Sequence, residues 1–324
     1  MSDSQGMIIQ DLYCDYYESD VTPQELVSSH WQEFHQKVNV HMAEGKIDAL
    51  QGFGFGDMEY RSLPTRIFSW LTILSYLCHL KNRGEILKMK KVARPIAKKM
   101  GFPFSYDCFR QACALSFLSE HFSAQPPKKI INIGDGYGFF SSMLKEIYPE
   151  AKIVLVDLGK TLLFQSYYCQ KVFPQAKHVL VKAGELVDNQ ADFIYCPSEL
   201  LSELDDQKFD FAVNIASMQE MNEETVNQYF QFLRTHLHQE NRFYCCNREE
   251  KRMAQGEISR FLSYPWQAED QHFVDGKCPW YKYVLSHHRT EKGPQLGKWR
   301  IPLVNYFDGE MFHRFSKLNV MTKK

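Results

Sequence analysis

The stretch KIINIGDGYGF, residues 129–139, decides the fold of this chain. Its first five residues form a mostly apolar run, which is typical of a buried strand. Gly134, Gly136 and Gly138 follow at alternate positions, where a backbone without side chains can turn tightly and let a ligand approach. Residues 139–148 then have the apolar spacing of a helix. A strand, a glycine turn and a helix in this order predict a binding site at the carboxyl end of a parallel strand.

The rest of the carboxyl-terminal part alternates short apolar runs with helical patterns. This alternation predicts right-handed crossovers and an α/β fold over residues 126–324, with a Rossmann-like, mostly parallel sheet and helices on both faces. We expect strands at residues 129–133, 152–156, 193–196, 209–215 and 242–246, helices at residues 139–148, 162–173 and 223–237, and last strands at residues 283–288 and 301–307.

Residues 1–125 have a different pattern. Between Pro23 and Phe122 the apolar residues recur at helical spacing, and Pro126-Pro127 marks the change of architecture. The glycine-rich stretch 52–56 interrupts this pattern and is expected to form a loop. We expect a mostly helical amino-terminal region that caps the carboxyl edge of the sheet and shapes the ligand pocket. The alternative is a region for self-association, which would give a homo-oligomer.

Composition and charge narrow the class of protein. Hydrophobic residues make up 44% of the 324 residues, as in packed globular proteins. With 38 basic against 39 acidic side chains, the net charge of -1 gives no general electrostatic reason to bind nucleic acid or anionic lipid. The basic run at residues 88–99 is interpreted as the solvated face of a helix, because charge runs usually serve solubility.

The sequence shows no targeting or membrane signal. Residues 1–20 are polar and acidic, unlike a secretion signal. The longest apolar stretch, residues 67–80, is too short and too polar to span a bilayer. Nine cysteines, an odd number without a C-x-x-C pair, favour reduced thiols in the cytoplasm and predict no metal site.

The glycine spacing distinguishes between nucleotide cofactors. A dinucleotide fingerprint, G-x-G-x-x-G, needs its third glycine at the position of Phe139, so this fingerprint fails. Asp157 ends the second strand, 19 residues after Gly138, where a carboxylate can accept both hydroxyls of a ribose. Its alternative role is to cap the helix that starts near Thr161. The amino end of the helix at Phe139 is expected to favour a ligand carboxylate or phosphate.

The spacing of Gly134, Gly136 and Gly138 resembles the first motif of class I S-adenosylmethionine-dependent methyltransferases. The Phe-Asp opening of the strand at residues 209–215 is similar to the same family. The resemblance implies S-adenosylmethionine (SAM) as the cofactor, with its methionine end on the glycine turn. That family usually begins the motif with an acidic residue where this chain has Asn132, and Asp135 is expected to compensate for the missing charge. The cofactor-binding residues implied are Asn132, Gly134, Asp135, Gly136, Gly138, Asp157, Leu158 and Asn214.

A more specific resemblance is to the sugar O-methyltransferase family of bacterial surface-glycan gene clusters. It rests on the long amino-terminal segment, the Gly-Asp-Gly-x-Gly turn, the run Ser217-Met218-Gln219-Glu220-Met221 and the pair Asn247-Arg248. The resemblance implies methyl transfer to a hydroxyl of a sugar or glycan precursor. Two alternatives remain, which are a small non-sugar metabolite as the acceptor, or a SAM-binding protein without turnover.

A sugar hydroxyl is a poor nucleophile, so a general base within hydrogen-bond reach would help. Glu220, just after the fourth strand, is the first choice, and its alternative role is to begin the next helix. Asn214 is expected to flank the reaction centre. His288 is the histidine candidate, with His287 and His272 as alternatives, because imidazole titrates near neutrality. The aromatic residues expected to form a sugar-stacking wall, unless they fill a core, are Trp266, Trp280, Tyr281 and Tyr283.

Overall fold

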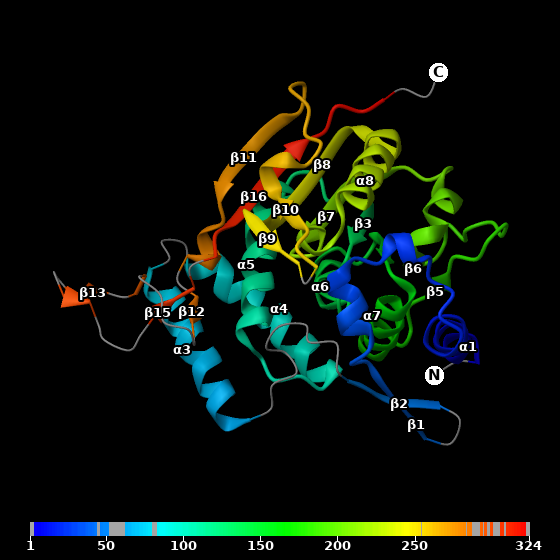
Figure 1. Ribbon diagram of the computed structural model, residues 1–324, viewed down its shortest axis with the longest axis horizontal. Helices are drawn as coiled ribbons and strands as arrows, with labels where there is room; N and C mark the ends of the chain where they lie inside the picture. Colours follow the sequence, from blue (N-terminus) through cyan, green and yellow to red (C-terminus); the bar gives the residue numbers. More distant parts are fainter. Residues whose placement is uncertain are drawn as a thin grey trace.

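The computed structural model describes residues 3–43, 46–51, 62–79, 83–253, 255–282, 284–286, 292–293, 295–296, 299–300, 305–307 and 309–321. Within these ranges the chain folds around a sheet of eight strands with helices on both faces (Figure 1). Five neighbouring strand pairs are parallel and two are antiparallel, so the sheet is mostly parallel. The predicted α/β, Rossmann-like fold with a mostly parallel sheet, preceded by a helical region, is confirmed.

The central strand β3 lies between β4 and β7. The chain leaves β3 toward β4 on one side and later reaches the other side at β7, so the strand order reverses at β3. In open parallel sheets, ligands bind at the carboxyl ends of the strands at such a point. In spatial order the strands are β11 (Gln271–Lys277), β16 (Met311–Lys317), β8 (Leu237–Arg248), β7 (Phe209–Ile215), β3 (Lys129–Ile133), β4 (Lys152–Asp157), β6 (Phe193–Pro197) and β5 (His178–Leu180).

Residues 283–288 and 301–307 are predicted to supply the last strands, but their described parts form only a short pair outside the main sheet. The main sheet is completed by β16 and β11, with β16 antiparallel between β8 and β11. The sequence pattern missed β11 because most of its residues are exposed, so it lacks the apolar run of a buried strand. Two of the short strand pairs outside the main sheet lie near the carboxyl terminus: β12 (Leu285–Ser286) pairs with β15 (Asn305–Tyr306), and β13 (Gln295–Leu296) pairs with β14 (Trp299–Arg300).

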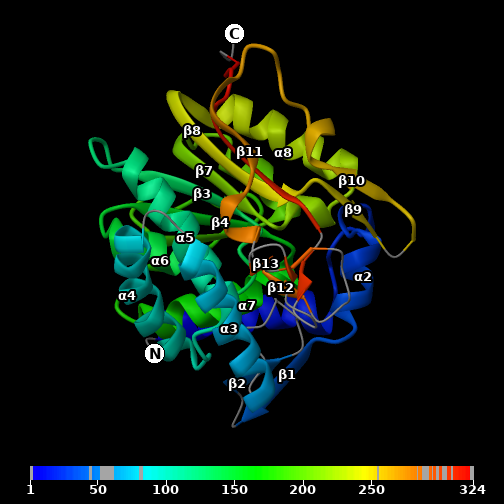
Figure 2. The same cartoon turned by 90° about the vertical axis from the view of Figure 1, so that its left-hand side faces the viewer.

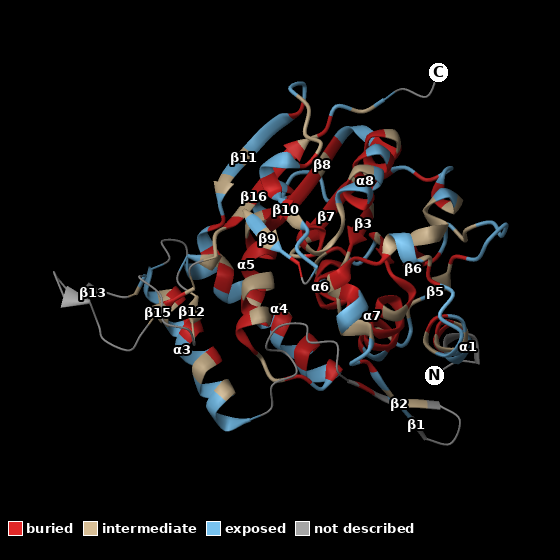
Figure 3. Cartoon of the chain, in the orientation of Figure 1, coloured by how far each residue is buried: buried red, intermediate tan, exposed pale blue. Residues whose placement is uncertain are grey.

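Two hydrophobic cores cover the two faces of the sheet, because alternate residues of a strand point to opposite sides. Ile130 belongs to the core under α5, α6 and α7, and Ile131 to the core under α8. Figure 3 shows buried residues concentrated in the central strands and in the helices that pack against them. The helices and strands predicted for residues 129–246 are confirmed, and the short β5 was not predicted. The helices of this part are α6 (Phe139–Ile147), α7 (Gly159–Val172) and α8 (Glu223–His236).

The amino-terminal region is mostly helical, as predicted, and also contains a hairpin that the sequence pattern did not indicate. Buried residues of α4 and α5 belong to the same core as those of α6 and α7. α2 lies beside the hairpin of β9 (Glu250–Arg252) and β10 (Ile258–Arg260), where Ser29 Oγ donates to Glu257 at 2.8 Å (Figure 2). The elements of the region are α1 (Asp3–Leu12), α2 (Ser29–His35), β1 (Asn39–Ala43), β2 (Lys46–Gln51), α3 (Leu63–His79), α4 (Arg83–Met100) and α5 (Tyr106–His121).

The basic run at residues 88–99 lies on α4. Lys88 and Lys91 are exposed, whereas Ile86 and Met89 are buried on the opposite side of the helix. This arrangement supports the interpretation as a solvated face. The glycine-rich stretch 52–56 lies outside the described residues. None of the helices that the structure describes combines the length and the apolar character needed to cross a membrane.

Candidate functional site

A cavity of about 310 Å³ opens at the carboxyl ends of β3, β4 and β7. The turn after β3 supplies Gly134 and Gly136, β4 supplies Asp157, and the loop after β7 supplies Ser217 and Glu220. Neighbouring parallel strands end at the same edge of a sheet, so residues far apart in the sequence meet here. The volume lies within the range of small-molecule sites, roughly 300–1,000 Å³. Gly136 and Asp157 therefore face one open space.

The three glycines of the turn have left-handed backbones but different neighbours. A Cβ atom on Gly134 would lie 1.8 Å from Ser217 Oγ, so the turn and the loop after β7 approach closely only because this residue is glycine. A Cβ on Gly138 would lie 2.5 Å from Cys169 Sγ of α7. Gly138 is not among the residues that line the cavity, and it serves the packing of α6 against α7. The expectation that Gly138 admits a ligand is therefore not supported by its position.

Asp135 lines the cavity and also closes the amino end of α6. Its carboxylate accepts from the backbone N–H groups of Phe140 at 3.1 Å and Ser141 at 2.7 Å. The helix end thus already holds an internal carboxylate, which corrects the expectation that it binds a carboxylate or phosphate of the ligand. Burial raises the pKa of Asp135 to about 7, against the effect of these hydrogen bonds. Asn132, also in the wall of the cavity, donates to Ser141 Oγ at 2.9 Å.

Asp157 ends β4 and faces the same cavity. Its Oδ1 accepts from the N–H of Leu158 at 2.8 Å, and its Oδ2 accepts from Gln165 Nε2 at 2.7 Å. A carboxylate oxygen can accept two hydrogen bonds, so each oxygen retains capacity for one more donor. Burial raises the pKa of Asp157 to about 7. Leu158, and not Asp157, is the N-cap residue of α7, and Leu158 is not among the residues that line the cavity.

Asn214 has a positioning role at the end of β7. Its side-chain Nδ2 donates to the carbonyl of Ile133 at 2.8 Å. Its Oδ1 accepts from the N–H of Met218 at 3.2 Å and from Asn247 Nδ2 at 2.8 Å. The side chain is fully buried and does not line the cavity. The expectation that Asn214 touches the cofactor or the reacting atoms is thus contradicted, because its hydrogen bonds tie β7 to β3 and β8.

Glu220 lines the cavity between Lys251 and His30. Its Oε1 lies 2.6 Å from Lys251 Nζ, and its Oε2 lies 3.4 Å from His30 Nε2. Burial alone would raise the pKa of Glu220, but the hydrogen bond from His30 and the charge of Lys251 lower it to about 2. A carboxylate with such a low pKa is a weak base near neutral pH. The geometry therefore contradicts the expectation that Glu220 is the general base.

The structure instead brings in His30, which the sequence analysis missed. His30 lies on α2 and lines the cavity, with 20% of its side chain exposed. Two contacts hold this segment against the loop after β7, which are Ser28 Oγ donating to the carbonyl of Glu220 and Asn222 Nδ2 donating to the carbonyl of Glu25. No local pattern could have identified His30, because its neighbour in the site, Glu220, is far from it in the sequence.

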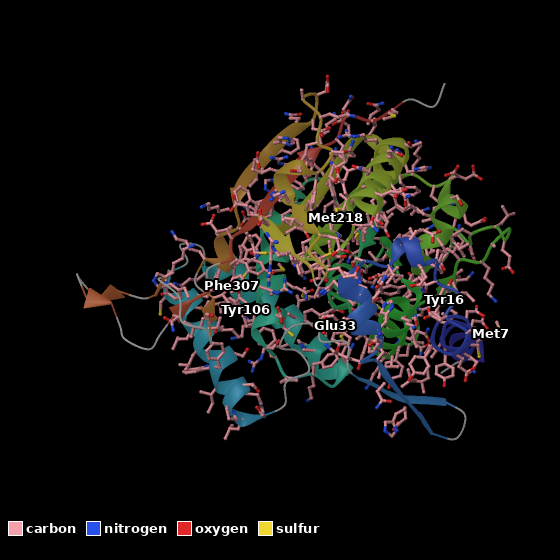
Figure 4. The ribbon with its side chains drawn as sticks, in the orientation of Figure 1. Met7, Tyr16, Glu33, Tyr106, Met218 and Phe307 are labelled. Carbon is pink, nitrogen blue, oxygen red and sulfur yellow. The ribbon has the colours of Figure 1, made fainter. Side chains whose placement is uncertain are left out.

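The opposite end of the cavity is formed by α5, the end of β8 and the segments before β16. Arg110 pairs with Asp107 and donates to the hydroxyl of Tyr281. Tyr106, labelled in Figure 4, donates to the carbonyl of Trp280 at 2.6 Å and so fixes the Tyr281 turn against α5. Phe307, also labelled there, lies under the guanidinium of Arg248. Gln111 of α5 and Met311 of β16 also line the cavity.

The predicted aromatic wall is mostly absent from the cavity. Of the described members, only Tyr281 lines it, while Trp280 is buried and Trp266 packs in the core under α8. His272 lies on β11 and hydrogen bonds to Ser316 Oγ at 2.8 Å, away from the cavity. The other candidates, Tyr283, His287 and His288, lie outside the described residues. In the part of the chain that is described, no three histidine, cysteine or acidic side chains are arranged to hold a metal ion.

Comparisons with known proteins give structural likeness alone. No family model and no curated protein matches the sequence. The N-methyltransferase NodS from Bradyrhizobium japonicum WM9, in complex with S-adenosyl-L-homocysteine, has a TM-score of 0.42 and 9% identity over 70% of this chain and 98% of NodS. Thermoplasma acidophilum 1320 has a TM-score of 0.42 and 10% identity over 71% of this chain and 99% of that chain.

TehB from Haemophilus influenzae has a TM-score of 0.38 and 10% identity, and the match covers 62% of this chain and 61% of TehB. This chain thus spans less than two thirds of TehB. Values this low say nothing about the substrate or mechanism of this chain. Its function has to be argued from its own residues.

We expect Gly134→Ala to destabilise the protein. The new side chain meets Ser217 and a left-handed backbone, which together cost about 2–4 kcal/mol of unfolding free energy. In a Ser217→Gly background the steric part disappears, so the same change should cost only about 1–2 kcal/mol. Urea denaturation of the four proteins measures both costs. Equal costs in the two backgrounds would contradict the close contact between turn and loop.

Proposed function

We propose that this chain is a SAM-dependent methyltransferase whose acceptor is a hydroxyl of a sugar or glycan precursor. The observation that carries the proposal is the single cavity faced by Gly136 and Asp157 at the ends of β3 and β4. SAM carries a ribose, a cationic ammonium and a cationic sulfonium. The cavity offers a glycine-rich turn and two carboxylates, the half-buried Asp135 and the buried Asp157, so the residues present fit this cofactor. When bound, SAM supplies a methyl group that an oxygen nucleophile can displace from sulfur.

The carboxylates divide the task of holding the cofactor. Asp157 is placed to accept ribose hydroxyls, because each of its oxygens has room for one more donor. Asp135 supplies negative charge beside the glycine turn, where the family usually has an acidic residue at the position of Asn132. Asp157 is buried and Asp135 is half-buried, and a carboxylate in a region of low dielectric attracts a cation more strongly than in water.

His30 is the proposed general base. The acceptor hydroxyl must lose its proton as its oxygen bonds to carbon, and an imidazole in the cavity wall is a group that can take this proton. Since Nε2 of His30 faces Glu220, the other ring nitrogen, Nδ1, is available for the hydroxyl. Glu220, kept ionised by Lys251, would then stabilise the imidazolium that forms. In this proposal Glu220 supports the base and is not the base itself.

The amino-terminal region serves the site as a cap. α2 brings His30 to the cavity, and α5 brings Arg110 and Gln111. Residues 1–125 therefore supply part of the wall, which supports the cap over the alternative of a region used only for self-association. Holding an acceptor hydroxyl against such a wall, close to the methyl donor, can supply much of the rate enhancement of a displacement reaction.

We expect calorimetry to detect binding of SAM and of S-adenosylhomocysteine. Asp157→Ala removes charged acceptors for ribose hydroxyls and should weaken binding by about 10- to 100-fold, because charge-assisted hydrogen bonds contribute about 1.5–3 kcal/mol. Asp206→Ala, at an exposed position before β7, is the matched control. Failure of the wild-type protein to bind either compound would reject the proposal. Release of S-adenosylhomocysteine on addition of sugars, against non-sugar metabolites, separates a sugar enzyme from the two alternative functions.

The affinity for SAM should rise between about pH 6 and pH 8. The pKa values of Asp135 and Asp157 are raised to about 7 by burial, so both carboxyls of the ligand-free protein are largely protonated below pH 7. A cationic ligand favours their ionised form, and binding at about pH 6.5 should therefore release protons. Calorimetry at that pH, in two buffers of different ionisation enthalpy, measures the release. A binding heat independent of the buffer would contradict this assignment.

We expect His30→Gln to lower kcat for methyl transfer by about 10²- to 10⁴-fold, the usual contribution of a general base. The affinity for S-adenosylhomocysteine should remain close to that of the wild type, since the carboxylates proposed to hold the cofactor, Asp135 and Asp157, are unchanged. His79→Gln, at an exposed position at the end of α3, is the matched control. Steady-state rates with a saturating acceptor make the comparison. An unchanged kcat would leave His30 without a catalytic role.

A further inference from the structure

The two ends of the cavity differ in charge. The end at the glycine turn carries the half-buried carboxyl of Asp135 and the buried carboxyl of Asp157. The other end carries Arg248, the last residue of β8. Two other cations near this end are paired with acidic side chains, Arg110 with Asp107 and Lys251 with Glu220. Within the described ranges, by contrast, no acidic side chain forms an ion pair with Arg248.

Arg248 is held in place by contacts that leave its charge unneutralised. Its backbone N–H donates to Gln219 Oε1 at 2.7 Å, which fixes the end of the strand against the loop after β7. Its guanidinium carbon lies 5.2 Å from the centre of the Phe307 ring. An aromatic ring under a planar guanidinium orients the group and leaves its N–H edge able to donate two parallel hydrogen bonds. Carboxylates and phosphates match that pair of donors.

Two uncharged groups in the wall of the same cavity have hydrogen-bonding capacity that the described part of the protein does not use. The hydroxyl oxygen of Tyr281 accepts from Arg110, so its own hydrogen can be donated to a ligand. Burial raises the pKa of Tyr281 far enough that the phenol stays protonated near neutral pH. Gln111 Oε1 is buried and accepts no hydrogen bond from any described residue. This oxygen is an acceptor for a ligand hydroxyl.

We infer that this end of the cavity binds an anionic group of the acceptor, a carboxylate or a phosphate, through Arg248, with neighbouring hydroxyls on Gln111. The inference rests on the proposed function and names the class of its acceptor as an acidic or phosphorylated sugar. The anion pairs with Arg248 and accepts from Tyr281, while the cationic cofactor is held at the acidic end. Opposite charges at the two ends thus orient the acceptor and cofactor along the cavity.

The test compares three probes on the full-length protein saturated with S-adenosylhomocysteine. Glucuronate, glucose 6-phosphate and neutral glucose share the same ring, and their affinities are measured by calorimetry. We expect one or both charged probes to bind at least about 10-fold more tightly than glucose, since charge-assisted pairs discriminate more strongly than neutral ones. The two charged arms distinguish a carboxylate from a phosphate as the recognised group. Equal affinities, or no binding of any probe at about 10 mM, would overturn the inference.

Substitutions of Arg248 test whether this residue causes the preference for charged sugars. Arg248→Met should remove the preference for charged probes, and Arg248→Lys should retain part of it, because lysine keeps the charge without the paired donors. Arg260→Met, at an exposed arginine paired with Glu250, should keep the full preference. A preference that survives in a folded Arg248→Met protein would also overturn the inference. Thermal melting confirms that each variant is folded.

The two hypotheses fail in different measurements. If S-adenosylhomocysteine does not bind, the proposed function fails, and the probes are then compared on the protein alone. If S-adenosylhomocysteine binds but the charged and neutral sugars do not differ, only the anionic acceptor is rejected. The acceptor class and the methyl donor are therefore tested independently.

Discussion

The close approach of the glycine turn to the loop after β7 is the constraint on which the site depends. Gly134 leaves no room for a side chain against Ser217, and Asn214 then joins the ends of β3, β7 and β8 through three hydrogen bonds. These contacts set the position of the loop that carries Glu220, and through Glu220 the position of His30 and Lys251. A change at the strand ends would therefore move His30 and Lys251, which are distant from the glycine turn and from each other in the sequence.

The free-energy cost of burying charged groups is the second constraint, and each carboxylate of the cavity has different partners that reduce this cost. Asp135 receives two backbone N–H groups at the start of α6, where unpaired amides would otherwise need a partner. The Glu220 carboxylate is stabilised by Lys251 and by the hydrogen bond from His30, which lower its pKa. Asp157 has one backbone and one side-chain donor, and burial dominates its pKa. Carboxyl groups in one cavity thus have different protonation states at neutral pH, because their neighbours differ.

The amino-terminal region explains how a sheet of common architecture acquires a specific pocket. The glycine turn and Asp157 belong to the sheet, whereas His30, Arg110 and Gln111 come from helices that precede it. The core of α4 and α5 is continuous with that of α6 and α7, so the position of α5 at the cavity is fixed by packing. Under the proposed function, cofactor binding is a property of the sheet, and recognition of the acceptor is largely a property of the added helices and the carboxyl-terminal segments.

The sequence by itself determined the elements whose signals are local. The apolar run, the glycine spacing and the helical periodicity around residues 129–148 predicted β3, the turn and α6, and the same signals predicted β4, β6, β7 and α8. They failed for β11, because an exposed edge strand has no apolar run, and for Gly138 and Asn214, because a residue type does not show which neighbour it meets. Only the tertiary structure decided that His30 and Glu220, 190 residues apart, form a pair, and that Arg248 lies in the same cavity without an acidic partner among the described residues. Such contacts depend on how helices pack on the sheet, and packing joins segments that no local pattern relates.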